Sequence, residues 1–221
     1  MIHRKTGRKT EELYSRYWSS ILVIIFAVSV YPEPSGQVWK TETVEDFETA
    51  VYSEKDLKVR QDAEVLPDIR VSSTLTSPLL DSGKSLLIRI TDYIESPVEL
   101  LLKKKYECPD YLGSLIFHVY SSGSDAVLLM GLLDSDNNYR RIKISSMNFQ
   151  GWRKIRVNIK SKLPQDDIIF NRHEVITLQS IYIHMGSTGK NLKEAIIILD
   201  DIQAETRKKY RVADELRRLT Y

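Results

Sequence analysis

The chain has 221 residues, of which 42% are hydrophobic and 28% are charged, a balance typical of a folded protein and not of a disordered one. Its formal net charge of +2 argues against a nucleic-acid partner, because no dominant basic field would attract phosphate. The single cysteine, Cys108, excludes an intrachain disulfide and a cysteine-based metal cluster. We expect this thiol to be half-buried and inert.

The N-terminal segment has the features of an export signal. A polar stretch with a basic excess, residues 1–20, precedes the apolar run ILVIIFAVSV at 21–30. This run is shorter than the roughly 20 residues of a transmembrane helix and fits the apolar region of a signal peptide. We therefore expect residues 1–36 to be a signal peptide and short leader, cleaved after Ser29 or Gly36, with an uncleaved anchor as the alternative. Export without a disulfide pair or a lipid-attachment cysteine indicates a periplasm-like compartment.

Apolar and polar residues alternate with period two through the rest of the chain. The alternation predicts strands at 86–90, 114–122, 127–133, 139–145, 152–160, 178–186 and 195–206. The turn-forming residues DSDNN at 134–138 separate two of these runs and predict a hairpin. Many short strands without a βαβ rhythm indicate an all-β fold, an antiparallel β-sandwich or jelly roll over residues 37–206.

The end of the chain carries the strongest helical pattern. In TRKKYRVADELRRLT, residues 206–220, Tyr210, Ala213, Leu216 and Leu219 recur at helical spacing among basic side chains. We expect residues 207–221 to form a basic C-terminal helix or tail. Such a helix would either pack on the sandwich or dock on a neighbouring subunit or an acidic partner.

Two adjacent carboxylates interrupt the last predicted strand, AIIILDDIQAET at 195–206. A strict period of two places Asp200 on one face with Ile198 and Ile202, and Asp201 on the other. If the face with Asp200 is core, a cation, an arginine or several N–H donors must satisfy its carboxylate. The alternative is that the strand leaves the core at Asp200 and enters solvent.

No residue set with catalytic spacing is visible, neither a Ser/His/Asp set nor a Cys/His pair, so we expect no enzymatic activity. Trp39, Trp152 and the twelve tyrosines could form a face on which sugar rings stack. Trp152 opens a strand, however, and is expected to be buried. Exposed tyrosines also suit protein–protein contact.

Three segments resemble jelly-roll domains of the galactose-binding and carbohydrate-binding-module kind: TVEDFETA at 43–50, FQGWRKIRVNIKSKLPQ at 149–165, and the closing stretch at 178–204. Together with the signal peptide, the early VWKTETVEDFE, the length and the charged tail, the whole arrangement is similar to the FlaA family, the flagellar filament outer-layer (sheath) proteins of spirochaetes.

The FlaA resemblance implies a non-enzymatic, structural role in the sheath of the periplasmic flagellar filament. Such a protein binds the flagellin core or sibling sheath proteins, and it affects filament shape, stiffness and motility. Self-association would be possible, and no membrane span would remain after signal cleavage. The alternative function is an exported carbohydrate-binding module.

The resemblance to carbohydrate-binding jelly rolls also implies a metal site. In those proteins a Glu of the first strand and an Asp of the last often hold a structural calcium ion. Glu48 and either Asp200 or Asp201 match these positions, and hard oxygen ligands suit Ca²⁺. The competing interpretation is that Asp200 accepts backbone N–H bonds or pairs with Arg or Lys. No other cofactor is expected.

Overall fold

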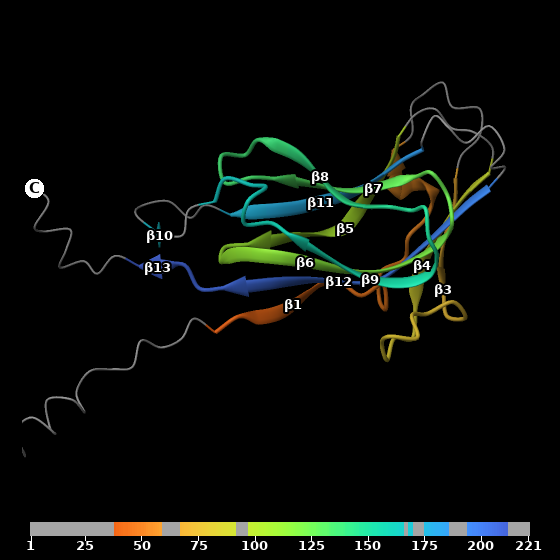
Figure 1. Ribbon diagram of the computed structural model, residues 1–221, viewed down its shortest axis with the longest axis horizontal. Helices are drawn as coiled ribbons and strands as arrows, with labels where there is room; N and C mark the ends of the chain where they lie inside the picture. Colours follow the sequence, from red (N-terminus) through yellow and green to blue (C-terminus); the bar gives the residue numbers. More distant parts are fainter. Residues whose placement is uncertain are drawn as a thin grey trace, which may run out of the picture. The chain divides into compact units, whose positions relative to one another are not determined.

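The computed structural model describes residues 38–58, 67–91, 97–165, 168–169, 175–185 and 194–211. The expected signal peptide and leader, residues 1–36, lie outside this part of the chain. The described residues form two antiparallel sheets that face each other (Figure 1). None of their helices is long and apolar enough to span a lipid bilayer.

The first sheet has the strand order β3-β4-β12-β6-β9, and β1 also pairs with β12. Its strands are β1 (Lys40–Glu45), β3 (Asp68–Ser72), β4 (Ser85–Thr91), β6 (Tyr111–Ser122), β9 (Gln150–Asn158) and β12 (Glu194–Arg207). Along one edge of β12, β4 pairs with residues 194–199 and β1 with residues 202–206, while β6 occupies the other edge. The first described strand, β1, therefore pairs with β12 near the other end of the described chain.

The second sheet has the order β2-β5-β11-β7-β8. Its strands are β2 (Leu57–Lys58), β5 (Val98–Cys108), β7 (Val127–Leu133), β8 (Tyr139–Ser146) and β11 (Ile176–His184). A 3₁₀ turn, η1 (Glu54–Asp56), precedes β2, and two short strands, β10 (Ile168–Ile169) and β13 (Tyr210–Arg211), pair in parallel.

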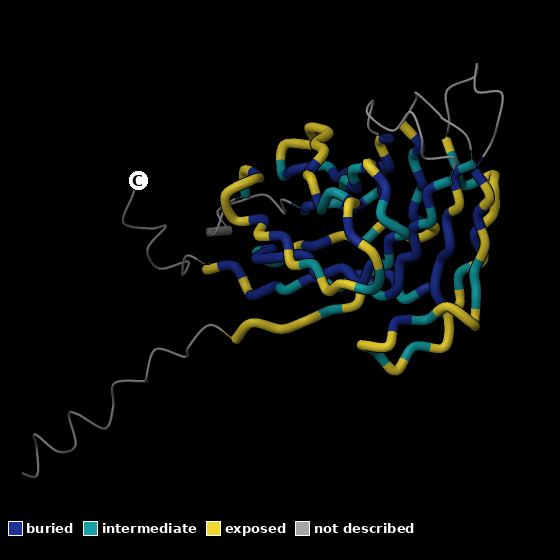
Figure 2. The backbone as a smooth tube through the Cα atoms, turned by 45° about the vertical axis from the view of Figure 1, so that its right-hand side comes forward, coloured by how far each residue is buried: buried dark blue, intermediate teal, exposed yellow. Residues whose placement is uncertain are grey.

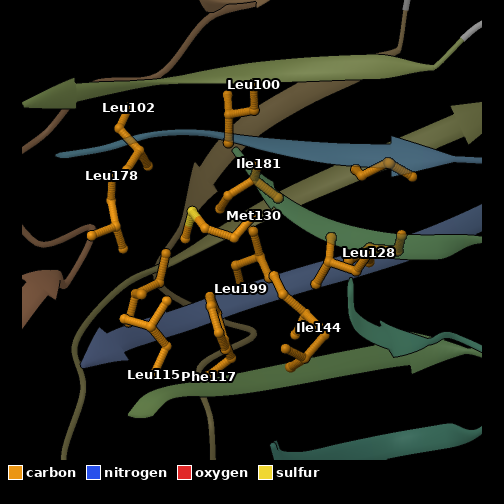
Figure 3. Close-up of a cluster of buried hydrophobic side chains, with 14 of the residues drawn as sticks. Leu100, Leu102, Leu115, Phe117, Leu128, Met130, Ile144, Leu178, Ile181 and Leu199 are labelled. Carbon is orange, nitrogen blue, oxygen red and sulfur yellow. The ribbon is translucent and has the colours of Figure 1, made fainter. Parts of the chain in front are cut away.

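The core fills the space between the two sheets (Figure 3). Leu100, Met130 and Ile181 of the second sheet and Phe117 and Leu199 of the first are all fully buried. Figure 2 shows buried residues in the interior of the fold, whereas strands β1, β8 and β9 carry many exposed residues. Burial of these apolar side chains is the dominant favourable term for such a fold.

The predicted fold class and every predicted strand are confirmed, and residues 127–133 form β7 with the same bounds. In β9 the predicted alternation holds, since Val157 is buried while Lys154 and Arg156 are exposed. The alternation pattern missed β5, an 11-residue strand, because the three lysines at 103–105 interrupt it.

The predicted C-terminal helix is wrong where the structure describes it. Strand β12 continues through Arg207, and Tyr210–Arg211 form β13. Thr206 pairs with Lys40 of β1 on one side and with Leu112 of β6 on the other. Pairing on both edges gives the backbone its hydrogen bonds within a sheet, and this tertiary context overrides the helix propensity of the sequence. Residues 212–221 of the predicted helix lie outside the described residues.

The predicted hairpin turn at 134–138 joins β7 to β8. The Asp134 N–H donates to the Asn138 carbonyl at 3.0 Å, and the Asn137 N–H donates to the Asp134 carbonyl at 3.0 Å. Asn137 adopts a φ of 61°, a conformation that Asn tolerates better than most residues. The carboxylate of Asp134 is fully buried and pairs with Arg140 Nε at 2.9 Å, so it fixes the turn from inside.

Candidate functional site

A β-bulge at Asp201 determines where the paired carboxylates point. Asp201 has a φ of 46°, and the register with β6 passes from Asp200↔His118 to Ile202↔Phe117 without it. Such a bulge moves the following side chains to the opposite face. Leu199 before the bulge and Ile202 after it both face the core, so Asp200 lies on the outer face of the first sheet. The prediction that Asp200 shares a face with Ile202 is wrong for this reason.

Asp200 is nevertheless fully buried. Its Oδ2 accepts a hydrogen bond from the backbone N–H of Ser77, in the β3–β4 connection, at 2.7 Å. Its Oδ1 and the Nδ1 of the neighbouring His118 have no hydrogen-bond partner among the described residues. Burial, followed by the charge of Lys154, lowers the pKa of His118. Of the alternatives for Asp200, acceptance of a backbone N–H is confirmed.

Glu48 holds the other end of the same connection. Its Oε1 accepts the N–H of Gly83 at 2.7 Å, the N–H of Lys84 at 2.9 Å and the hydroxyl of Ser82 at 3.1 Å. The Lys84 and Gly83 N–H groups lower the pKa of the Glu48 carboxyl, because they favour its charged form. Glu48 therefore binds one turn of backbone tightly.

The third predicted ligand, Asp201, lies in an environment with excess negative charge. Burial raises the pKa of its carboxyl, and the charges of Asp200, Asp46 and Glu48 raise it further. Within the described part of the chain, no group of three or more His, Cys, Asp or Glu side chains is arranged to hold a metal ion. Glu48 and Asp200 each already accept backbone N–H bonds. The structural calcium ion therefore stays a prediction.

A cluster of polar and aromatic side chains covers part of the outer face of the second sheet. We call it the tyrosine face: Tyr139 and Arg141 of β8, Ser180 and Tyr182 of β11, and Gly131 of β7. Gly131 lies in register between Ser180 and Arg141. On the adjacent register Met130, Ile142 and Ile181 point into the core, which places the tyrosine face on the outside.

Gly131 provides the space in which this cluster assembles. A Cβ at position 131 would overlap the Tyr139 hydroxyl and the Ser180 hydroxyl, and it would lie 3.0 Å from Cε2 of Tyr182. The Tyr139 side chain can thus fold back over β7 only because residue 131 has none. This is a close approach of the kind for which strands use glycine.

Hydrogen bonds fix the exposed ring of Tyr139. Its hydroxyl donates to the Tyr182 hydroxyl at 2.9 Å and lies 3.1 Å from the Ser180 hydroxyl. Arg141 Nη2 donates to the same Tyr182 oxygen at 3.2 Å, and its guanidinium carbon lies 4.1 Å from the Tyr182 ring centroid. Tyr182 is almost fully buried, whereas Tyr139 is 42% exposed. Tyr182 therefore supports the face, and Tyr139 and Arg141 present it to solvent.

The electrostatics keep Tyr182 in its neutral form. Burial raises the pKa of Tyr182 far above its ordinary value, and the Tyr139 hydroxyl and the Glu99 carboxylate raise it further. Tyr182 thus stays neutral and accepts bonds from its two partners. A fixed aromatic ring beside a guanidinium can bind a ring-shaped polar ligand, since the ring supplies an apolar plane and Arg141 supplies donors.

The aromatic residues singled out in the sequence behave differently. Trp39 is 41% exposed and lies at the other sheet, away from the tyrosine face. Trp152, expected to be buried, is half-buried on the first sheet, where its ring centroid lies 5.8 Å from that of Tyr120. Tyr139 and Tyr182 had no signal of their own in the sequence. They are 43 positions apart and meet only because β7 pairs with both β8 and β11.

No protein-family model and no curated protein matches the sequence. Solved structures of similar fold include a family 11 module from a cellulosomal cellulase of Clostridium thermocellum, at 12% identity and a TM-score of 0.43, covering 79% of this chain and 97% of that one. The family 61 module TmCBM61, in complex with β-1,4-galactotriose, has 12% sequence identity and a TM-score of 0.45, and the match covers 76% of this chain and 99% of that one.

A xylan-binding CBM22-2 domain of Paenibacillus barcinonensis has 16% sequence identity and a TM-score of 0.40, and the match covers 73% of this chain and 96% of that one. All three are carbohydrate-binding modules. Identities and TM-scores at this level do not transfer a ligand to this chain.

Proposed function

We propose that this protein is an exported, non-catalytic carbohydrate-binding module whose ligand lies on the tyrosine face. The observation that carries the proposal is the ring of Tyr139, which is 42% exposed yet held by hydrogen bonds to Tyr182 and Ser180. A ring that is already ordered loses little conformational entropy when a ligand binds. Its apolar plane suits stacking of a sugar ring, and the guanidinium of Arg141, 5.9 Å from the Tyr139 centroid, suits the sugar hydroxyls.

The test is a glycan array with the purified protein, followed by calorimetry on any glycan that binds. The variant Tyr139→Ala should abolish binding while the protein stays folded, with a melting temperature lowered by roughly 2–12 °C because its two hydrogen bonds to Tyr182 and Ser180 are lost. The matched control is Tyr210→Ala, since Tyr210 is also exposed, at 54%, but belongs to β13. A correctly folded protein that binds no glycan would remove this proposal.

The second candidate is the flagellar sheath role, which the FlaA resemblance implies. The same face supports it, because tyrosine and arginine are the residues that protein interfaces favour. Mass spectrometry of periplasmic filaments stripped of membrane should then find the protein in stoichiometric amount, and Tyr139→Ala should weaken its attachment. Absence from the filaments would remove the sheath role.

Export rests on residues 1–36 and is part of both proposals. The N-terminus of the protein isolated from its cells should begin after Ser29 or Gly36. An intact N-terminus in a protein free of membrane would contradict signal cleavage.

A further inference from the structure

A recess lies on the outer face of the first sheet, away from the tyrosine face. It has a volume of about 420 Å³, within the range of roughly 300–1,000 Å³ that small-molecule sites occupy. Its lining residues come from β6, β9 and β12, from the residue just before β1 and from the segment just after β9: Trp39, Gly113, Ser114, Arg156, Asn158, Lys160 and Glu205. We call this recess the Trp39 groove.

Trp39 forms an ordered aromatic wall of the groove. Its ring lies directly over Gly113, where a Cβ would overlap the six-membered part of the indole. The Tyr111 ring packs against it edge-on, with centroids 6.4 Å apart and an interplanar angle of 67°. Despite these contacts Trp39 remains 41% exposed. A large apolar ring that is held in place by packing and is still exposed to solvent can bind a flat ligand by stacking.

The charges around this ring are mostly positive. The ammonium of Lys160 lies 4.6 Å from the Trp39 ring centroid, and the guanidinium carbon of Arg207 lies 5.6 Å from it. Lys160 forms no ion pair with any carboxylate that the structure describes. Arg156 is partnered by Glu205, with 2.6 Å between Nη2 and Oε1.

Among the described residues that line the groove, Glu205 is the only carboxylate, and it is engaged twice. It accepts hydrogen bonds from Arg156 and from the hydroxyl of Ser114. The cations therefore outnumber the anions at the groove, and the ammonium of Lys160 is available to an incoming anion. An anionic group placed there would make a charge-assisted hydrogen bond.

We propose that the Trp39 groove binds an acidic sugar, a hexuronate unit within a saccharide. The sugar ring stacks on Trp39, its carboxylate pairs with Lys160, and its hydroxyls bond to Asn158 and Ser114. The carboxylate of Glu205 in the same wall accepts from hydroxyls and repels a di- or triphosphate, which favours a singly charged sugar over a nucleotide. The site goes beyond the proposed function, because it belongs to the other sheet and requires a charged ligand.

The experiment compares one ligand in two charge states. The probe is a tetrasaccharide containing glucuronic acid, and its partner is the same tetrasaccharide with its carboxyl groups reduced to alcohols. Binding is followed by quenching of tryptophan fluorescence and by calorimetry with the purified protein. We expect the acidic form to bind about tenfold more tightly than the reduced form, the scale of one charge-assisted contact, and we expect salt to diminish this difference.

Two variants test the charge contact of Lys160 and the stacking on Trp39 separately. Lys160→Gln should weaken the acidic ligand about tenfold and leave the reduced ligand unchanged, whereas Trp39→Ala should abolish binding of both. Lys162→Gln is the matched control, since Lys162 is exposed and does not line the groove. Lys160 also projects from the surface, so its variant should melt at the wild-type temperature.

Three results would overturn the proposal: equal affinity for the two forms, quenching by ATP but not by the acidic tetrasaccharide, or full binding by Trp39→Ala. Tyr139→Ala leaves this groove intact, so loss of glycan binding at the tyrosine face and loss at the Trp39 groove are separate outcomes.

Discussion

Gly131→Ala offers the sharpest test of how the tyrosine face is built. The added methyl would occupy the space of the Tyr139 and Ser180 hydroxyls. Ser180 is fully buried and Tyr139 is 42% exposed, so the side chain free to move is Tyr139. We expect its ring to swing out into solvent and the β7–β8 pairing to persist.

The cost follows from the hydrogen bonds that Tyr139 would leave. Its contacts with Tyr182 and Ser180 are lost, and each such bond contributes a net 0.5–1.5 kcal/mol, about 1–3 kcal/mol together. For a domain of this size 1 kcal/mol corresponds to about 2–4 °C in melting temperature. The expected decrease is therefore roughly 2–12 °C, together with loss of glycan binding because the stacking ring is no longer fixed.

Gly151→Ala is the matched control. Gly151 has a φ of 91°, and a Cβ there would meet no atom within 4 Å. Its alanine variant suffers only backbone strain, about 1–2 kcal/mol, and Tyr139 is untouched. Thermal unfolding followed by circular dichroism should show both variants destabilised, but only Gly131→Ala should change the near-ultraviolet tyrosine signal and the affinity for glycans. An unchanged tyrosine signal in Gly131→Ala would refute the packing argument.

Three further predictions concern the turn, the thiol and the metal. Asp134→Ala should lower the free energy of unfolding by roughly 2–4 kcal/mol in urea titration, because the carboxylate accepts the N–H groups of Asp136 and Asn138 and pairs with Arg140. A loss below about 1 kcal/mol would contradict this role. Burial would raise the pKa of Asp134, but the bonds from Arg140, Asn138 and Asp136 outweigh it and lower that pKa below 3.8, so this contribution is present above pH 3.8 and is lost as the pH falls through the folded-state pKa. Burial raises the pKa of the Cys108 thiol from 9.0 to about 11, so Ellman's reagent should modify the folded protein only at its unfolding rate. The stability of the fold should decrease as the pH rises above 9.0, where only the unfolded thiol ionises. Immediate modification would show that the thiol is accessible. If a structural calcium ion is bound, millimolar Ca²⁺ should raise the melting temperature over that in EDTA, and Glu48→Gln should remove the difference; equal melting temperatures of the wild type in the two buffers would end the calcium hypothesis.

The strands could be predicted because burial of one face of a strand produces a local alternation of apolar and polar residues in the sequence. In β9, Ile155 and Val157 alternate with Lys154 and Arg156, and the structure keeps that alternation. The helix at the C-terminus could not be judged locally, because its residues do have helical spacing. At Thr206, where the structure describes this pattern, pairing with strands at both edges decides the conformation, and that pairing depends on residues 40 and 112.

The site was less predictable than the fold. The sequence supplied twelve tyrosines but not the strand order that selects Tyr139 and Tyr182. Nothing in the sequence around Gly131 or Gly113 shows that these glycines are needed. Each is required because one aromatic side chain packs over it. An adjacent pair of aspartates likewise gives no sign of which of them takes a positive φ. The bulge at Asp201 is a property of how β12 fits β6.

The bulge also explains why the outer face of the first sheet is divided into two parts. It returns Ile202 to the core while Asp200 stays on the outer face. There the Asp200 carboxylate accepts the N–H of Ser77, while Glu48 accepts the N–H groups of Gly83 and Lys84. The β3–β4 connection is thus attached at two points, Ser77 and Gly83–Lys84, over the part of the sheet that contains Asp200. Further along β12 the connection no longer covers the face, and Glu205 lines the open Trp39 groove. A cation on Glu48 and Asp200 would bind two carboxylates that already accept backbone N–H bonds from this connection, so its effect should be on the attachment of this connection and not on the groove.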